Sequence, residues 1–228
     1  MDQNKQGTKC LYFASLIVNA AVFLMVAGAV ISYFFMPGTG NMQVVGARCF
    51  VYFTIDSNIL AAVACLLSIP YDVRSARSGK DEFPPFLRYF KFTGTAAVSV
   101  TFFTVMLFLG PTMGYDMMFV GNSFSLHLVC PFLCMIALPA LEQRKKVAFA
   151  PALAGLAPVV VYGAVYMTMV VFIGAARGGW VDFYGFNVGG KWYLSFVVML
   201  IATLLLSLGL RLWHNAFALD AVGKEEKK

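Results

Sequence analysis

Six long apolar runs constrain the fold of this 228-residue chain more than any other feature of its sequence. A helix needs about 20 apolar residues to cross the hydrocarbon core of a bilayer. The runs are therefore predicted transmembrane helices, and they cover residues 11–35, 48–69, 91–109, 123–141, 150–174 and 192–212. Short connections join them, so we predict that residues 1–228 form a single transmembrane domain.

The kind of residue in these runs favours helices over a membrane β-barrel. Strict alternation of polar and apolar residues marks a transmembrane β-strand, and the runs lack it. Only 12% of the residues are charged, against about 25% in a typical soluble domain. We expect an all-α integral membrane protein, a bundle of six transmembrane helices.

Basic residues predict the orientation of the bundle. One side carries 14 of the 17 lysines and arginines: Lys5, Lys9, Arg74, Arg77, Lys80, Arg88, Lys91, Arg144, Lys145, Lys146, Arg211, Lys224, Lys227 and Lys228. Only Arg48, Arg177 and Lys191 remain for the other side. The positive-inside rule then places both termini in the cytoplasm. Contact with anionic lipid explains the basic loops, so no nucleic acid is expected as a partner.

The second run opens with polar residues that lipid does not favour. The stretch VYFTIDSNIL, residues 51–60, contains Thr54, Asp56, Ser57 and Asn58. On a helix, Thr54, Ser57 and Asn58 share one face, whereas Asp56 projects nearly opposite Thr54. Polar faces of membrane helices point into the bundle, away from lipid.

A histidine in the fourth run is predicted to lie at the same depth as Thr54. Thr54 lies six residues below Arg48, and His127 lies five residues below Asn122 on a helix of the same direction. Ser195, in the last run, enters at this level too. We expect these side chains to lie close together in the outer half of the bundle.

A hydroxyl beside an imidazole can act as a nucleophile with its general base. We therefore predict that Thr54 attacks an ester and His127 takes its proton. Ser57, Asn58 or a backbone N–H would stabilise the oxyanion, and Asp56 would orient His127 or tie helices together. The alternative is purely structural, since membrane threonines often bond to helix carbonyls and a buried histidine often only packs.

Three stretches carry a resemblance to a known family. YFTIDSNIL resembles the second-helix motif of the androgen-induced and androgen-dependent TFPI-regulating protein family of membrane threonine hydrolases. HLVCPF, residues 127–132, is similar to its histidine motif, and GGWVDFYGFN, residues 178–187, to its outer aromatic turn. The family's Tyr-Pro-Phe is here Tyr184-Gly185-Phe186.

The resemblance implies that Thr54 and His127 cleave fatty acid esters of hydroxy fatty acids or similar membrane lipid esters. It also implies a bacterial-type relative in the inner membrane or the equivalent cell membrane. Trp180, Tyr184 and Trp192 are then candidates for a substrate gate, with a simple interfacial aromatic belt as the alternative.

Other functions stay open at this point. Buried ionisable groups often mark ion pathways, so Asp56 and His127 would suit a small transporter or a lipid-binding protein. An acyltransferase would use the same nucleophile and pass the acyl group to an alcohol. No metal or cofactor is expected: Cys130 and Cys134 share a face near His127, but no second cluster completes a metal site.

Overall fold

The computed structural model describes residues 2–36, 46–142 and 145–222. Within these residues, six helices are long and apolar enough to cross a membrane: Thr8–Phe35, Phe53–Ser78, Pro85–Met113, Asn122–Leu141, Phe149–Ile173 and Trp192–Ala218. The predicted fold class is confirmed, and the protein is an all-α, multi-pass membrane protein. Four basic residues used to predict its orientation lie outside the described residues: Arg144, Lys224, Lys227 and Lys228.

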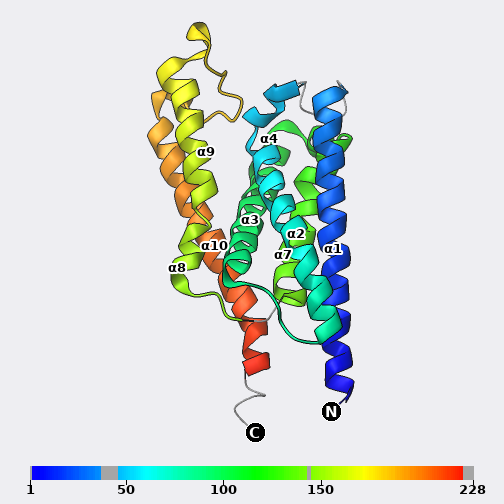
Figure 1. Ribbon diagram of the computed structural model, residues 1–228. Coiled ribbons are helices and arrows are strands. Elements are labelled where there is room, and N and C mark those ends of the chain that lie inside the picture. The colour runs from blue at the N-terminus through cyan, green and yellow to red at the C-terminus, as the bar shows by residue number, and fades with distance from the viewer. Residues whose placement is uncertain (1, 37–45, 143–144, 223–228) are drawn as a thin grey trace.

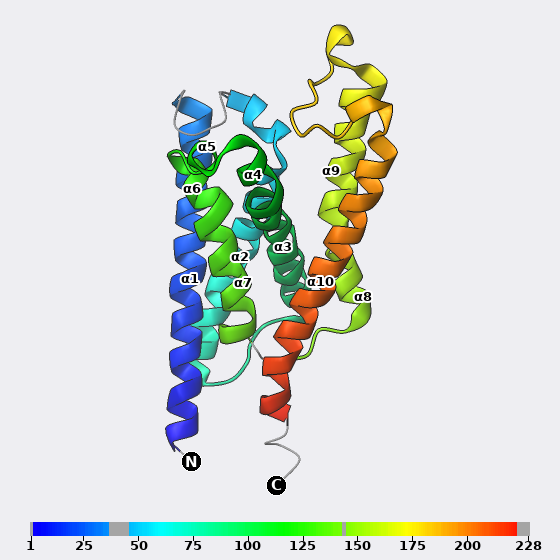
Figure 2. The same ribbon diagram turned by 180° about the vertical axis from the view of Figure 1, so that it is seen from behind.

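The long helices form two groups (Figures 1 and 2). The first is a bundle of α1 (Asp2–Phe35), α2 (Phe53–Ser78), α3 (Pro85–Thr104) and α7 (Cys130–Leu141). The second is a pair beside it, α9 (Ala157–Met167) and α10 (Trp192–Val222). The start of α1 and the end of α10 lie at the same end of the molecule (Figure 1).

Shorter elements complete the spans and their connections. They are η1 (Gly46–Val51), η2 (Val105–Leu109), α4 (Gly110–Met113), α5 (Tyr115–Met118), α6 (Asn122–Phe124), η3 (Ser125–Val129), α8 (Phe149–Ala154), η4 (Thr168–Ile173), η5 (Ala175–Arg177) and η6 (Val188–Gly190). Three of them, η2, η3 and η4, are π-helical turns inside transmembrane spans. Turns of this kind often occur at functional sites.

The second span differs most from its prediction. Residues 46–51 form the separate 3₁₀ helix η1, so α2 begins at Phe53 instead of residue 48. At its other end α2 continues through Pro70 to Ser78, although proline removes a backbone hydrogen bond. The later start matters, because it places Thr54 in the first turn of a helix.

The core of the bundle brings α1, α2 and the fourth span together. Its fully buried side chains include Val22 and Val26 from α1, Ile55 from α2 and Leu126 from η3. Thr54 and His127 are neighbours in sequence of Ile55 and Leu126. Packing of this apolar core therefore brings the two polar residues together at the outer end of the bundle.

Candidate active site

Thr54 and His127 meet in the buried interior, as their predicted depth requires. The Oγ1 atom of Thr54 lies 3.4 Å from Nε2 of His127. Thr54 is 7% exposed and His127 is 3% exposed. A hydroxyl and an imidazole are thus paired in a position shielded from bulk water.

The contact made by the other ring nitrogen of His127 determines whether Thr54 or His127 donates the hydrogen bond between them. Nδ1 lies 2.7 Å from the carbonyl oxygen of Met118. A carbonyl only accepts hydrogen bonds, so Nδ1 carries the proton, and Nε2 of the neutral ring has a free lone pair. The Thr54 hydroxyl therefore donates to Nε2, which is the arrangement a general base requires.

The loop before η3 places the Met118 carbonyl over His127. It includes α5 and is bounded by Gly114 with φ 94° and Gly121 with φ 54°. Backbone with positive φ favours glycine, so these two positions allow the chain to turn back toward the helix. A main-chain carbonyl thus orients the imidazole, and Asp56 does not perform this role.

Pro131 leaves a backbone carbonyl of η3 available to accept a hydrogen bond from Asn58 of α2. In the π-helical turn η3 the Cys130 N–H donates to Ser125 O, and Pro131 has no N–H for Leu126 O. Nδ2 of Asn58 donates to that carbonyl at 3.0 Å and to Thr54 O at 2.8 Å. The amide therefore links the residue before His127 to the backbone of Thr54.

Ser57 holds α2 against α3. Its hydroxyl lies 2.8 Å from Oγ1 of Thr101 and donates to Thr54 O at 3.2 Å. The prediction that Ser57 or Asn58 serves the oxyanion directly is therefore not supported, because both side chains are engaged in positioning Thr54. Both lie on the Thr54 face of α2, but their donors point to the backbone carbonyls of Thr54 and Leu126.

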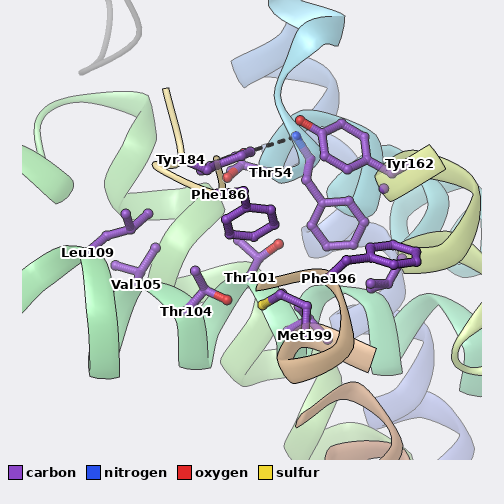
Figure 3. A pocket seen from close by; sticks show the side chains of 14 residues that line it. Thr54, Thr101, Thr104, Val105, Leu109, Tyr162, Tyr184, Phe186, Phe196 and Met199 are labelled. Atoms are coloured by element: carbon purple, nitrogen blue, oxygen red, sulfur yellow. Dashed lines mark hydrogen bonds between the residues drawn. The ribbon is translucent and has the colours of Figure 1, made fainter. Parts of the chain in front are cut away.

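A small apolar cavity of about 50 Å³ adjoins Thr54. It is lined by helices α2, α3, α9 and α10, the turn η2 and the loop between η5 and η6. Figure 3 shows the lining side chains. They are Phe53, Thr54, Val100, Thr101, Thr104, Val105, Leu109, Val159, Tyr162, Gly163, Tyr184, Phe186, Phe196 and Met199. Ligand sites are mostly apolar with a few polar groups, and the lining has this composition, although the space is smaller than the roughly 300–1,000 Å³ that ligand sites typically span. The Thr54 hydroxyl forms part of its wall.

Tyr184 supplies a second hydroxyl next to Thr54 (Figure 3). Its phenolic oxygen accepts from the Phe53 N–H at 3.2 Å. Burial raises the pKa of Tyr184 above its usual value, and hydrogen bonds with the Tyr162 and Thr54 side chains offset only part of this. The phenol therefore remains protonated at neutral pH and retains an O–H to donate.

Asp182 stabilises, through hydrogen bonds, the turn that places Tyr184 next to Thr54. One carboxylate oxygen accepts from the Tyr166 hydroxyl at 2.8 Å and from the Phe186 N–H at 2.9 Å. The other accepts from the Asn187 N–H at 2.8 Å. The Tyr184 N–H donates to the Tyr166 hydroxyl at 3.0 Å, so a single network shapes this turn.

Asp56 and Trp180 line a groove that does not include Thr54 or His127. Both line a groove between α2, α3 and α9, on the other side of Phe53 and Tyr162 from the Thr54 cavity. Asp56 has the orientation expected from its phase on α2, nearly opposite Thr54. Among the described residues, no hydrogen bond or ion pair joins Asp56 to His127, whose ring nitrogens contact Thr54 and Met118.

Ser195 and Trp192 do not reach the cavity either. On α10, Phe196 and Met199 line it, and Ser195 lies one residue off that face. Trp192 packs in the outer aromatic cluster, 5.8 Å from the Phe172 ring between centroids. The predicted depth of Ser195 concerned its position along α10 and said nothing of its direction around the helix.

The site contains three contributors that the sequence prediction missed. The Met118 carbonyl has no sequence signal, since every residue has a carbonyl. Tyr162 and Thr101 line the cavity, but the sequence does not show which faces of their helices point toward α2. Within the described residues, no group of three or more His, Cys, Asp or Glu side chains is arranged to hold a metal ion.

Comparisons of the chain with protein-family models, with curated proteins and with solved structures found no match.

Proposed function

We propose that this protein is an intramembrane hydrolase of lipid esters, with Thr54 as nucleophile and His127 as general base. The main support for this proposal is the hydrogen bond from the Thr54 hydroxyl to Nε2 of His127. Nδ1 of the same ring is hydrogen-bonded to Met118 O. This geometry gives the threonine proton a destination as the oxygen attacks.

The first half of the reaction forms an acyl-enzyme. Oγ1 of Thr54 attacks the ester carbonyl, and its proton passes to Nε2 of His127. The tetrahedral intermediate collapses, the imidazolium returns the proton to the leaving oxygen, and an alcohol departs. The Met118 carbonyl stabilises the transient imidazolium through Nδ1–H.

The second half releases the fatty acid. His127 takes a proton from water, the resulting hydroxide adds to the acyl-threonine carbonyl, and Thr54 recovers its proton as the carboxylic acid leaves. If an alcohol replaces water, the same intermediate yields a new ester. Product analysis therefore separates a hydrolase from an acyltransferase.

Two groups suit the developing oxyanion. The Tyr184 O–H lies beside Thr54 and is kept protonated by burial. Thr54 also lies in the first turn of α2, where the helix dipole favours negative charge, while the N–H groups of Phe53, Ile55 and Asp56 already donate to the Tyr184 hydroxyl and to Tyr52 O. Preorganised donors of this kind act where charge develops in the transition state.

The cavity supports a fatty acyl substrate. Its lining is aliphatic and aromatic except for hydroxyls, and it has no charged side chain. The resemblance of three stretches to the androgen-induced and androgen-dependent TFPI-regulating proteins points in the same direction, to fatty acid esters of hydroxy fatty acids. Membership of that family is part of the proposal.

The test is turnover of a branched fatty acid ester by the purified protein in detergent micelles. Thr54→Val keeps the shape of the side chain but removes the hydroxyl, and we expect kcat/KM to fall by at least about 10³-fold. Thr54→Ser should retain part of the activity because it keeps a nucleophilic oxygen.

Thr168→Val is the matched control. Its hydroxyl bonds to Ala164 O in its own helix at 2.8 Å, away from His127. Loss of the hydroxyl here should leave kcat/KM within about twofold, since exposed substitutions usually have small effects. Full turnover by a folded Thr54→Val protein would refute the proposed nucleophile.

A further inference from the structure

A second cavity lies at the opposite end of the bundle from Thr54. Its lining comes from α3, α7, α10 and the connection between α7 and α8. The residues that distinguish it are basic: Arg88, Lys91, Lys145, Lys146 and His214. The Thr54 cavity has no charged residue, so the two sites suit different chemistry.

The charges in and around this basic pocket do not cancel. Arg88 pairs with Asp81, and Lys91 pairs with Glu142. Lys145 and Lys146 are exposed, and in the part of the chain that the structure describes no carboxylate forms an ion pair with either. With Asp72, which lies in the buried network beneath Lys91, four cations face three carboxylates, which leaves a net positive site.

Arg88 contributes a donor that its protein partners do not use. Its terminal nitrogen bonds to Asp81 and to Phe83 O. Its Nε is buried and has no hydrogen-bond partner among the described residues. Buried donors are normally satisfied, and the guanidinium fork matches the oxygens of a phosphate.

A buried polar network forms the floor of the basic pocket. Nζ of Lys91 donates to Glu142 and, at 2.5 Å, to Oδ1 of Asn19, whose amide donates to Asp72 at 2.6 Å. Lys91 is 5% exposed, so this network holds it in place. A charged floor accepts a polar head group and disfavours an acyl chain.

The position of the pocket places it at a membrane surface. It lies at the end where α1 starts and α10 ends, the side that the basic residues predict to be cytoplasmic (Figure 1). Basic pockets between membrane helices on this side commonly bind anionic head groups.

From these observations we propose that the basic pocket binds a phosphate group on an anionic ligand at the cytoplasmic surface. The phosphate oxygens accept from Arg88 and from Lys145 and Lys146, while apolar Leu138 and Pro85 also line the pocket. The phosphate is carried either by a lipid diester or by a soluble molecule, and the experiment distinguishes these sources.

The experiment follows thermal unfolding of the full chain in detergent by tryptophan fluorescence at constant ionic strength. Three additions are compared: phosphatidylglycerol, phosphatidylcholine and inorganic phosphate. We expect a rise in Tm of roughly 3–6 °C with phosphatidylglycerol at about ten times its Kd, and none with phosphatidylcholine. A rise with inorganic phosphate also supports the site and assigns it to soluble phosphates.

Charge-matched variants make the result specific. The double variant Lys145→Gln/Lys146→Gln should lose the rise, because it removes two exposed cations without touching a buried pair. Arg77→Gln/Lys80→Gln removes the same charge from exposed positions at the end of α2 and should keep the rise. Equal loss in both double variants, or no rise with either anionic addition (phosphatidylglycerol or inorganic phosphate), would overturn the proposal.

Discussion

At the scale of single residues, Thr54 differs from the other buried hydroxyls in the destination of its proton. Ser68, Ser99 and Thr203 each donate to the carbonyl four residues earlier in the same helix. That is the usual arrangement for a hydroxyl in a helix. Thr54 instead contacts the imidazole of a different span, which separates it from a purely structural threonine.

The Tyr184 hydroxyl is a separate test of the oxyanion assignment. Tyr184→Phe keeps the ring that lines the cavity but removes the donor, and we expect kcat to fall by about 10²-fold with little change in KM. Steady-state kinetics on the branched ester measure both. Tyr193→Phe, at an exposed tyrosine of α10, is the control. An unchanged kcat for Tyr184→Phe would remove Tyr184 from the mechanism.

The sequence predicted residues whose chemistry is visible in the side chain. Thr54 and His127 stood out as polar groups at one depth in apolar spans, and the structure joins them. The Met118 carbonyl was beyond prediction, because only the path of the loop between two glycines brings it to His127. Asn58 was predicted to serve the oxyanion, but in the structure its amide donates to Leu126 O of another helix, a contact that the sequence could not reveal.

At the scale of elements, the π-helical turn η3 determines how the site is assembled. Its geometry and Pro131 together leave Leu126 O for the amide of Asn58. Hydrophobic periodicity located the span but could not reveal a local change in backbone hydrogen bonding. The same limit applies to α2, whose start moved to Phe53 because η1 takes the preceding residues.

Pro131→Ala tests this role of the turn. Alanine supplies an N–H that competes with Asn58 for Leu126 O, so we expect Thr54 to shift relative to His127 and kcat to fall at least about tenfold. Ester turnover gives kcat, and the thermal midpoint checks folding. Pro139→Ala, in the same helix but far from Asn58, should preserve kcat. Equal activity of the two variants would argue against the mechanism.

At the scale of the whole molecule, contacts made by the residues just before α2 join the four-helix bundle to the α9–α10 pair. Tyr162 of α9 donates to Val51 O at 2.8 Å, and the rings of Tyr52 and Phe183 lie 4.7 Å apart. These contacts connect the bundle to the α9–α10 pair. The number of spans was predictable from apolar length, but this contact between distant segments was not.

The orientation of the whole bundle predicts a labelling pattern. Lys80 and Arg177 are exposed and lie in connections on opposite sides of the predicted membrane. In a Cys10→Ser background, an impermeant maleimide added to intact cells should label Arg177→Cys and not Lys80→Cys, and both after lysis. Labelling of Lys80→Cys alone in intact cells would mean that the termini are external.

The most direct test of the account is to locate the covalent adduct of a fluorophosphonate probe by peptide mass spectrometry. We predict that the probe modifies Thr54, that Thr54→Val abolishes the adduct, and that His127→Ala slows its formation sharply because the general base is lost. An adduct on another hydroxyl, such as Ser57 or Ser195, or undiminished labelling of Thr54→Val, would contradict the assignment of Thr54 as nucleophile.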